Sequence, residues 1–61
     1  MFKLEIETGG AAFKDEDGNF DINAYEVRRL LKEIDRKLQS WYNSGYLMDI
    51  NGNKVGHWSY D

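Results

Sequence analysis

The N-terminal segment alternates between apolar and charged side chains. Phe2, Leu4 and Ile6 occupy every second position, and lysine or glutamate stands between them. Because successive side chains of a strand point to opposite faces, this pattern predicts a strand with one face in a core and the other in water. Two glycines at positions 9 and 10 interrupt the pattern, and residues 11–13 either continue the strand past a bulge or return as a short second arm.

A stripe of apolar residues follows at spacings of three and four, the period of an α-helix. Its members are Val27, Leu30, Leu31, Ile34, Leu38 and Trp41. Asn23 is a good N-cap and Glu26 stands three residues later, as in a capping box, so we expect the helix to begin at about Ala24. The Asn-Ser-Gly run at 43–45 tolerates left-handed backbone and predicts the helix end at residues 41–43.

Two β-prone runs complete the chain, joined by an Asn-Gly dipeptide at positions 51 and 52 that is typical of a two-residue hairpin turn. With that turn, Asp49 faces Lys54 and Met48 faces Val55. One face then carries Tyr46, Met48, Ile50, Val55 and His57. The other face carries Leu47, Asp49, Lys54, Gly56, Trp58 and Tyr60. A three-residue loop with a bulge would instead shift one strand and exchange its faces.

The order strand, helix, strand, strand predicts an α+β fold, with one amphipathic helix packed on a roughly three-stranded sheet of antiparallel type. One face of the sheet stays open. With 61 residues, we expect residues 1–61 to form a single small domain with a thin margin of stability. Self-association would extend so small a core.

Composition favours a cytoplasmic protein. The chain has no cysteine, which excludes disulfides and thiolate metal sites and favours a reducing compartment. Glutamates near the N-terminus stand where an export signal needs an apolar run, and no apolar stretch approaches the length of a membrane span. We therefore expect no contact with a membrane.

The acidic segment DEDGNFDINAYE, residues 15–26, has the oxygen spacing of a calcium-binding loop. The candidate calcium ligands are Asp15, Asp17, Asn19 and Glu26. Such a loop needs glycine at its sixth position, where this chain has Phe20, and Gly18 stands at the fourth. We therefore favour a solvated turn followed by the helix cap, and keep calcium binding as the alternative.

Groups for catalysis are few. His57 is the only histidine, and Ser40, Ser44 and Ser59 lie in no motif that activates a nucleophile. We therefore predict a protein that is not an enzyme, with no catalytic residue, no cofactor and no metal.

Charge is segregated along the chain, whose net charge is −3. The predicted helix is basic outside its apolar stripe, and its candidate contacts to phosphate or to an acidic partner are Arg28, Arg29, Lys32 and Arg36. A nucleic-acid domain normally has a basic isoelectric point, and this chain's is about 5.0, so we favour ion pairs on a solvated face. Nucleic-acid contact stays an alternative. A DNA mimic is another, through Glu5, Glu7, Asp15, Glu16, Asp17, Asp21, Asp49 and Asp61.

Aromatic residues exceed what one helix on one sheet can cover. The chain has two tryptophans, four tyrosines and three phenylalanines. Exposed tryptophan and tyrosine often anchor protein interfaces. The candidate residues of a partner or dimer interface are Trp58, Tyr60, Leu47, Tyr42 and His57. The last strand is also a candidate free edge for pairing with a second copy.

The runs FKLEIETGGAAF, YEVRRLLKEIDRKLQ and DINGNKVGHW together resemble small, uncharacterised proteins of bacteriophages and prophages of Gram-positive bacteria. The ending HWSYD departs from the shorter, more charged ending expected of that group. The resemblance implies an accessory factor of a phage. Some factors of this kind inhibit host-defence proteins such as CRISPR effectors. The expectation is a non-enzymatic homodimer that binds and inhibits a host protein in the cytoplasm of an infected or lysogenic bacterium.

Overall fold

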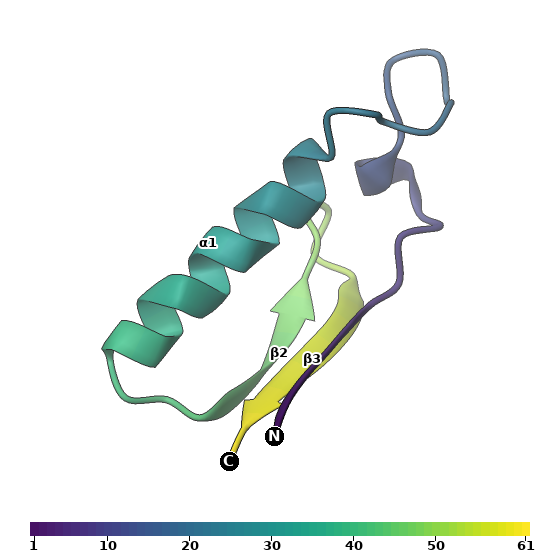
Figure 1. The fold of residues 1–61 in the computed structure, drawn as a ribbon. Coiled ribbons are helices and arrows are strands. Elements are labelled where there is room, and N and C mark those ends of the chain that lie inside the picture. Colours follow the sequence, from purple (N-terminus) through teal and green to yellow (C-terminus); the bar gives the residue numbers. More distant parts are fainter.

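The computed structural model describes residues 1–61 and confirms the predicted α+β order. The elements are β1 (Phe2–Ile6), a 3₁₀ turn η1 (Ala11–Phe13), α1 (Tyr25–Gln39), β2 (Ser44–Met48) and β3 (Lys54–Tyr60). The strands form an antiparallel sheet of order β1-β3-β2, and α1 packs on one face of it beside β2 (Figure 1). The prediction of β3 as a free edge is therefore wrong, because β1 pairs with its outer side. The helix α1 is neither long nor apolar enough to cross a membrane.

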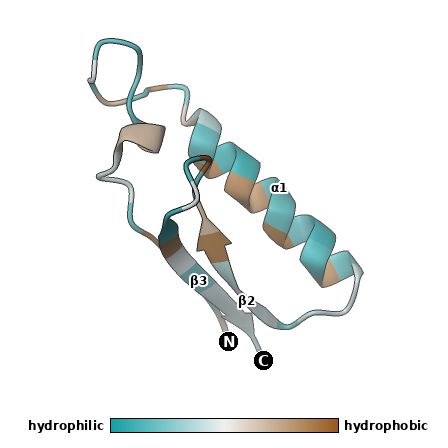
Figure 2. Cartoon of the chain, turned by 180° about the vertical axis from the view of Figure 1, so that it is seen from behind, coloured by the Kyte–Doolittle hydropathy of each residue, from teal (hydrophilic) through white to brown (hydrophobic).

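The core lies between α1 and the sheet. Its buried members are Phe13, Leu30, Ile34, Leu47 and Trp58, with one or two contributed by each of η1, α1, β2 and β3. The helical stripe is confirmed for most of its length, and Figure 2 shows apolar positions of α1 on the side toward the sheet. Leu31 and Trp41 are the exceptions, because both are exposed.

The helix begins differently from the predicted capping box. Its first residue is Tyr25, Ala24 has a left-handed backbone (φ 52°), and the side chain of the predicted cap, Asn23, makes no hydrogen bond to the helix. Asp21 caps instead, because its carboxylate accepts the N–H groups of Asn23 (2.9 Å) and Tyr25 (3.2 Å). The predicted partner in the box, Glu26, is turned toward the hairpin loop.

The hairpin has a three-residue loop in place of the predicted two-residue turn. The N–H of Asp49 donates to the carbonyl of Asn53 (2.8 Å), and Gly52 has φ 84°, as in a turn closed by a left-handed residue. Met48 therefore faces Lys54. Val55 is then the extra residue of a bulge, after which Leu47 faces Gly56 and the strands regain the predicted register.

Candidate functional site

The predicted interface is divided by the helix. Trp58 and Leu47 share a face as predicted, but α1 covers that face, so they are only 2% and 1% exposed and belong to the core. Because both are buried in the core, they are not available to the predicted partner or dimer interface. His57 lies exposed on the open side, Tyr60 is exposed at the end of the covered side, and Tyr42 follows α1. The five residues therefore do not form one patch.

Exposed apolar side chains are nonetheless abundant, and they differ from those predicted. Twelve large hydrophobic residues are exposed: Met1, Phe2, Phe20, Ile22, Tyr25, Leu31, Trp41, Tyr42, Tyr46, Met48, Ile50 and Tyr60. The molecule is elongated, 38 × 20 × 16 Å, and most of these residues lie toward its two ends. One end holds the loops and the start of α1, and the other holds the chain termini and the turn after α1 (Figure 1).

The turn after α1 presents a tryptophan to solvent. Trp41 is 94% exposed and has a left-handed backbone with φ 68°. Its N–H donates to the carbonyl of Leu38 (3.1 Å), and the N–H of Tyr42 donates to that of Lys37 (3.1 Å). These two bonds define a Schellman motif, in which the left-handed position is usually glycine. Trp41 occupies that position, not the 43–45 run expected from the sequence.

Tyr42 extends this surface. Its ring is about half exposed, and the ammonium group of Lys37 lies 4.7 Å from the ring centroid. That distance is within the range of a cation–π interaction, which favours one orientation of the ring. Residues 41 and 42, called here the aromatic turn, therefore place two aromatic side chains side by side in the sequence on a turn closed by backbone hydrogen bonds.

Glu26 and Arg29 join α1 to the hairpin loop. The Glu26 carboxylate accepts two bonds from the Arg29 guanidinium (2.7 and 3.0 Å) and one from the N–H of Ile50 (2.7 Å). Arg29 also donates to the carbonyl of Met48 (3.0 Å). The hydrogen bond from Arg29 lowers the pKa of Glu26, and the Ile50 N–H adds to this against the opposing effect of burial.

This ion pair takes the place of a neighbouring strand at the end of β2. The Met48 carbonyl and the Ile50 N–H belong to residues two apart, the pair of groups that one residue of an adjacent parallel strand would bind. Arg29 binds the carbonyl and Glu26 binds the N–H. Arg29 is therefore a structural residue, and its prediction as a phosphate contact is not supported by its surroundings.

The other three predicted cations form a stripe along the helix. Arg28, Lys32 and Arg36 lie four residues apart, are exposed, and make no salt bridge. Arg28 has its guanidinium 5.8 Å from the ring centroid of Tyr25. These three side chains, the basic stripe, are the part of the predicted contact surface that stays available to a partner.

The structure does not bring the candidate calcium ligands together. The Asp15 carboxylate accepts the N–H groups of Asp17 and Asn19, both at 2.9 Å, so it stabilises its own turn. Glu26 is turned to Arg29 and β2. No group of three or more histidine, aspartate or glutamate side chains is placed to hold a metal ion.

The same turn occurs twice in the chain. The Asp49 carboxylate accepts the N–H groups of Asn51 and Asn53 at 2.9 Å, two and four residues later in the chain, and Asp15 accepts the N–H groups at the same two spacings. Each loop also has a glycine with a left-handed backbone at its fourth position. The Asn53 N–H is the main cause of a lowered pKa at Asp49. The repeated letters D-x-x-G-N at 15–19 and 49–53 are the sequence signal for this motif.

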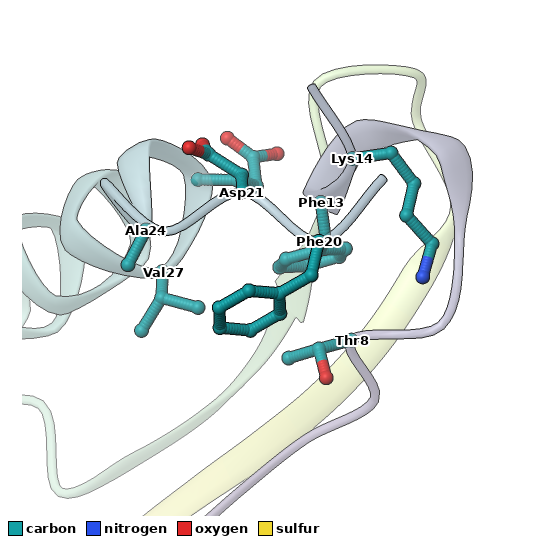
Figure 3. Close-up of a pocket in the computed structure, with 8 residues that line it drawn as sticks. Thr8, Phe13, Lys14, Phe20, Asp21, Ala24 and Val27 are labelled. Atoms are coloured by element: carbon teal, nitrogen blue, oxygen red, sulfur yellow. The ribbon is translucent and has the colours of Figure 1, made fainter. Parts of the chain in front are cut away.

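A small cavity lies between η1, the acidic loop and the start of α1. Phe13, Phe20 and Val27 form its apolar wall, and Figure 3 shows the two phenylalanine rings close to each other above Thr8. Its volume of about 90 Å³ is well below the roughly 300–1,000 Å³ of ligand pockets. The cavity has room for a few water molecules.

Acid is expected to weaken the fold through Glu26 and Asp49. Both pKa values lie below their ordinary values of 4.5 and 3.8, so the unfolded chain binds more protons in the range between the folded and ordinary values. The free energy of unfolding is therefore steady above about pH 5 and falls as the pH drops below about 4.5. Urea unfolding followed by circular dichroism at a series of pH values measures this.

A matched pair of variants assigns the acid effect. Glu26→Gln is expected to lose about 1–2 kcal/mol at neutral pH, because a neutral amide binds the partly exposed Arg29 more weakly. Glu26→Gln should also reduce the fall in the free energy of unfolding below about pH 4.5. Glu16→Gln is the control, because Glu16 is exposed and makes no hydrogen bond or ion pair. If the free energy of unfolding falls equally in acid for both variants, the acid effect does not come from Glu26.

Comparisons of the chain with protein-family models, with curated proteins and with solved structures found no match. The features that bear on function are therefore those of the chain itself. They are the aromatic turn, the basic stripe of α1 and the edges of the sheet.

Proposed function

We propose that this chain is a non-enzymatic, phage-encoded accessory protein that binds a host protein and blocks its activity, and that it acts as a homodimer. The observation that carries the proposal is the exposed Trp41 on a left-handed backbone. For a residue with a side chain this conformation costs about 1–2 kcal/mol, and glycine would avoid that cost. With 94% of the residue in solvent, packing within the chain offsets little of it.

Binding to a partner accounts for a tryptophan at this position. Tryptophan and tyrosine are enriched among the few residues that carry most of the energy of protein interfaces, and the aromatic turn offers one of each. Backbone strain kept at an exposed site is typical of functional positions. The turn is also stiffened by its two backbone hydrogen bonds, so ordering it on binding costs little entropy.

The charge of the chain supports a protein as the partner. The basic stripe of Arg28, Lys32 and Arg36 is attracted to acidic surfaces, which speeds association. The whole chain has a net charge of −3, which repels the phosphate backbone of nucleic acids over longer distances. The resemblance to phage proteins supports a host-defence protein, such as a CRISPR effector, as the class of target.

Trp41→Asn tests the aromatic turn. Asparagine tolerates the left-handed conformation, so the free energy of unfolding is expected to change by less than about 1 kcal/mol. Loss of an interface anchor costs about 2 kcal/mol or more, so affinity for the host target should fall by roughly 30-fold or more. Affinity capture from host lysate identifies the target, and titration of the purified target with each variant measures affinity and inhibition.

Ile22→Asn is the matched control. Ile22 is 85% exposed, lies at the opposite end of the molecule, and receives the same new side chain. It should bind and inhibit the target as the unmodified chain does. The proposal is wrong if Trp41→Asn and the unmodified chain bind the target equally, or if the bound target keeps its full activity.

A further inference from the structure

The two edges of the sheet differ. At β2, the last outward-facing groups are bound by Arg29 and Glu26, and α1 runs beside the strand (Figure 1). At β1, the N–H of Glu7 donates to the carbonyl of Val55 (2.6 Å), which fixes the direction of the strand's peptide groups. Backbone groups alternate along a strand, so the N–H and C=O groups of residues 3, 5 and 7 point toward β3. Those of Phe2, Leu4 and Ile6 point away from the sheet.

We propose that β1 pairs with β1 of a second copy of this chain, antiparallel, with the two-fold axis at Leu4. The two sheets then join into one of six strands, in the order β2-β3-β1-β1-β3-β2. Leu4 bonds Leu4 of the partner subunit, and Phe2 bonds Ile6 of the partner subunit, through the outward peptide groups that have no partner within the chain. This inference deepens the homodimer of the proposed function by naming its interface.

Charge complementarity selects this register. With Leu4 on the axis, Lys3 lies directly opposite Glu5 of the partner subunit, and Glu5 opposite the partner's Lys3. All four side chains lie on the open face of the sheet, because their neighbours on β3 are Ser59 and His57. Opposite charges that face each other across an antiparallel pair stabilise it.

Neighbouring registers oppose like charges. The outward peptide groups of the two β1 strands can bond only in registers that place even-numbered residues opposite even-numbered residues. The neighbouring registers of this kind are shifted by two residues in either direction. One such shift places Lys3 opposite Lys3 of the partner subunit, and the shift in the other direction places Glu5 opposite the partner's Glu5. Like charges directly opposite each other are destabilising. Of these three registers, the one centred on Leu4 is therefore the only one that opposes no like charges.

The same register covers apolar surface. Phe2 is exposed although its ring lies 6.3 Å from that of Trp58 and 6.4 Å from that of Tyr60. In the dimer, Ile6 of the partner subunit stands beside Phe2 on the face that α1 covers. The two cores then meet at a common row of apolar side chains. The added apolar burial stabilises a fold that is too small to bury much apolar surface alone.

Charge exchange tests the interface. Sedimentation equilibrium should give a dimer for the unmodified chain, and K3E or E5K alone should raise the dissociation constant at least about tenfold, because each leaves like charges facing each other. The double variant K3E/E5K should restore the dimer. An equimolar mixture of K3E and E5K should form a mixed dimer tighter than either variant with itself, since an acidic strand then meets a basic one.

Three outcomes would overturn the inference. They are an unmodified chain that is monomeric at millimolar concentration, single variants that associate as tightly as the unmodified chain, and a double variant that does not recover. Circular dichroism shows that each variant is folded. Host capture by the unmodified chain and by Trp41→Asn separates the two proposals, because a monomer that still captures its target loses only the dimer, and a dimer that captures nothing loses only the host-binding function.

Discussion

Trp58→Ala is expected to leave much of the chain unfolded at room temperature. Trp58 is 2% exposed on the central strand, and its indole Nε1 lies 3.0 Å from the position that a Cβ would take on Gly45. Removing a buried aromatic side chain costs about 3–5 kcal/mol through lost burial and the cavity left behind. A chain of this length has roughly 3–9 kcal/mol in total. Urea unfolding measured by circular dichroism gives the difference.

Tyr60→Ala is the matched control for this substitution. Tyr60 lies two residues further along β3 on the same side of the sheet, but it is 56% exposed. Its loss should cost about 1 kcal/mol, mainly from contact with Phe2. Equal losses for Trp58→Ala and Tyr60→Ala would show that Trp58 does not lie between α1 and the sheet.

Gly56→Ala is expected to separate β1 from β3. A Cβ at Gly56 would overlap the carbonyl oxygen of Glu5 and lie 3.1 Å from the Cα of Ile6, both backbone atoms of the adjacent strand. Backbone atoms cannot move aside as the end of a flexible side chain does, so the strands must part. We expect a loss of about 3 kcal/mol. Amide hydrogen exchange should show β1 losing protection first.

Gly10→Ala separates this clash from the general effect of replacing glycine. Nothing lies within 4 Å of a Cβ placed on Gly10, and its φ of −80° suits any residue. Its free energy of unfolding should change by less than about 0.5 kcal/mol. A Gly56→Ala variant as stable as Gly10→Ala would contradict the close approach of β1 and β3.

Periodicity predicted the elements because each pattern repeats over many residues. The alternation in β1 and the stripe of α1 arise because the side chains on one side of each element are buried. In a helix this burial recurs at every turn, and in a strand at every second residue. The ends of elements depend on single side chains, and these were predicted less well. Asp21 caps the helix where Asn23 was expected, and the Asp49 carboxylate favours a three-residue loop where Asn-Gly suggested two residues.

The face that the helix covers was not predictable from strand register alone. Register tells which side chains share a face, and β3 has large residues on both sides. Gly45 and Gly56 carried a usable signal, because both face the Trp58 side and leave room for close packing. Trp41 continued the helical spacing, yet the helix ends at Gln39 and leaves it in solvent. Contacts such as that between Glu26 and Ile50, 24 residues apart, have no local pattern.

The ion pair between Glu26 and Arg29 also bears on how large an assembly of this chain grows. A sheet with two free borders adds subunits without limit and makes fibres. Here the ion pair occupies the Met48 carbonyl and the Ile50 N–H at the end of the β2 edge, so that edge has fewer free groups for a partner there, and the proposed two-fold pairing uses the β1 edge of both subunits. The proposed pairing through β1 therefore favours an assembly that closes at two subunits over a fibre.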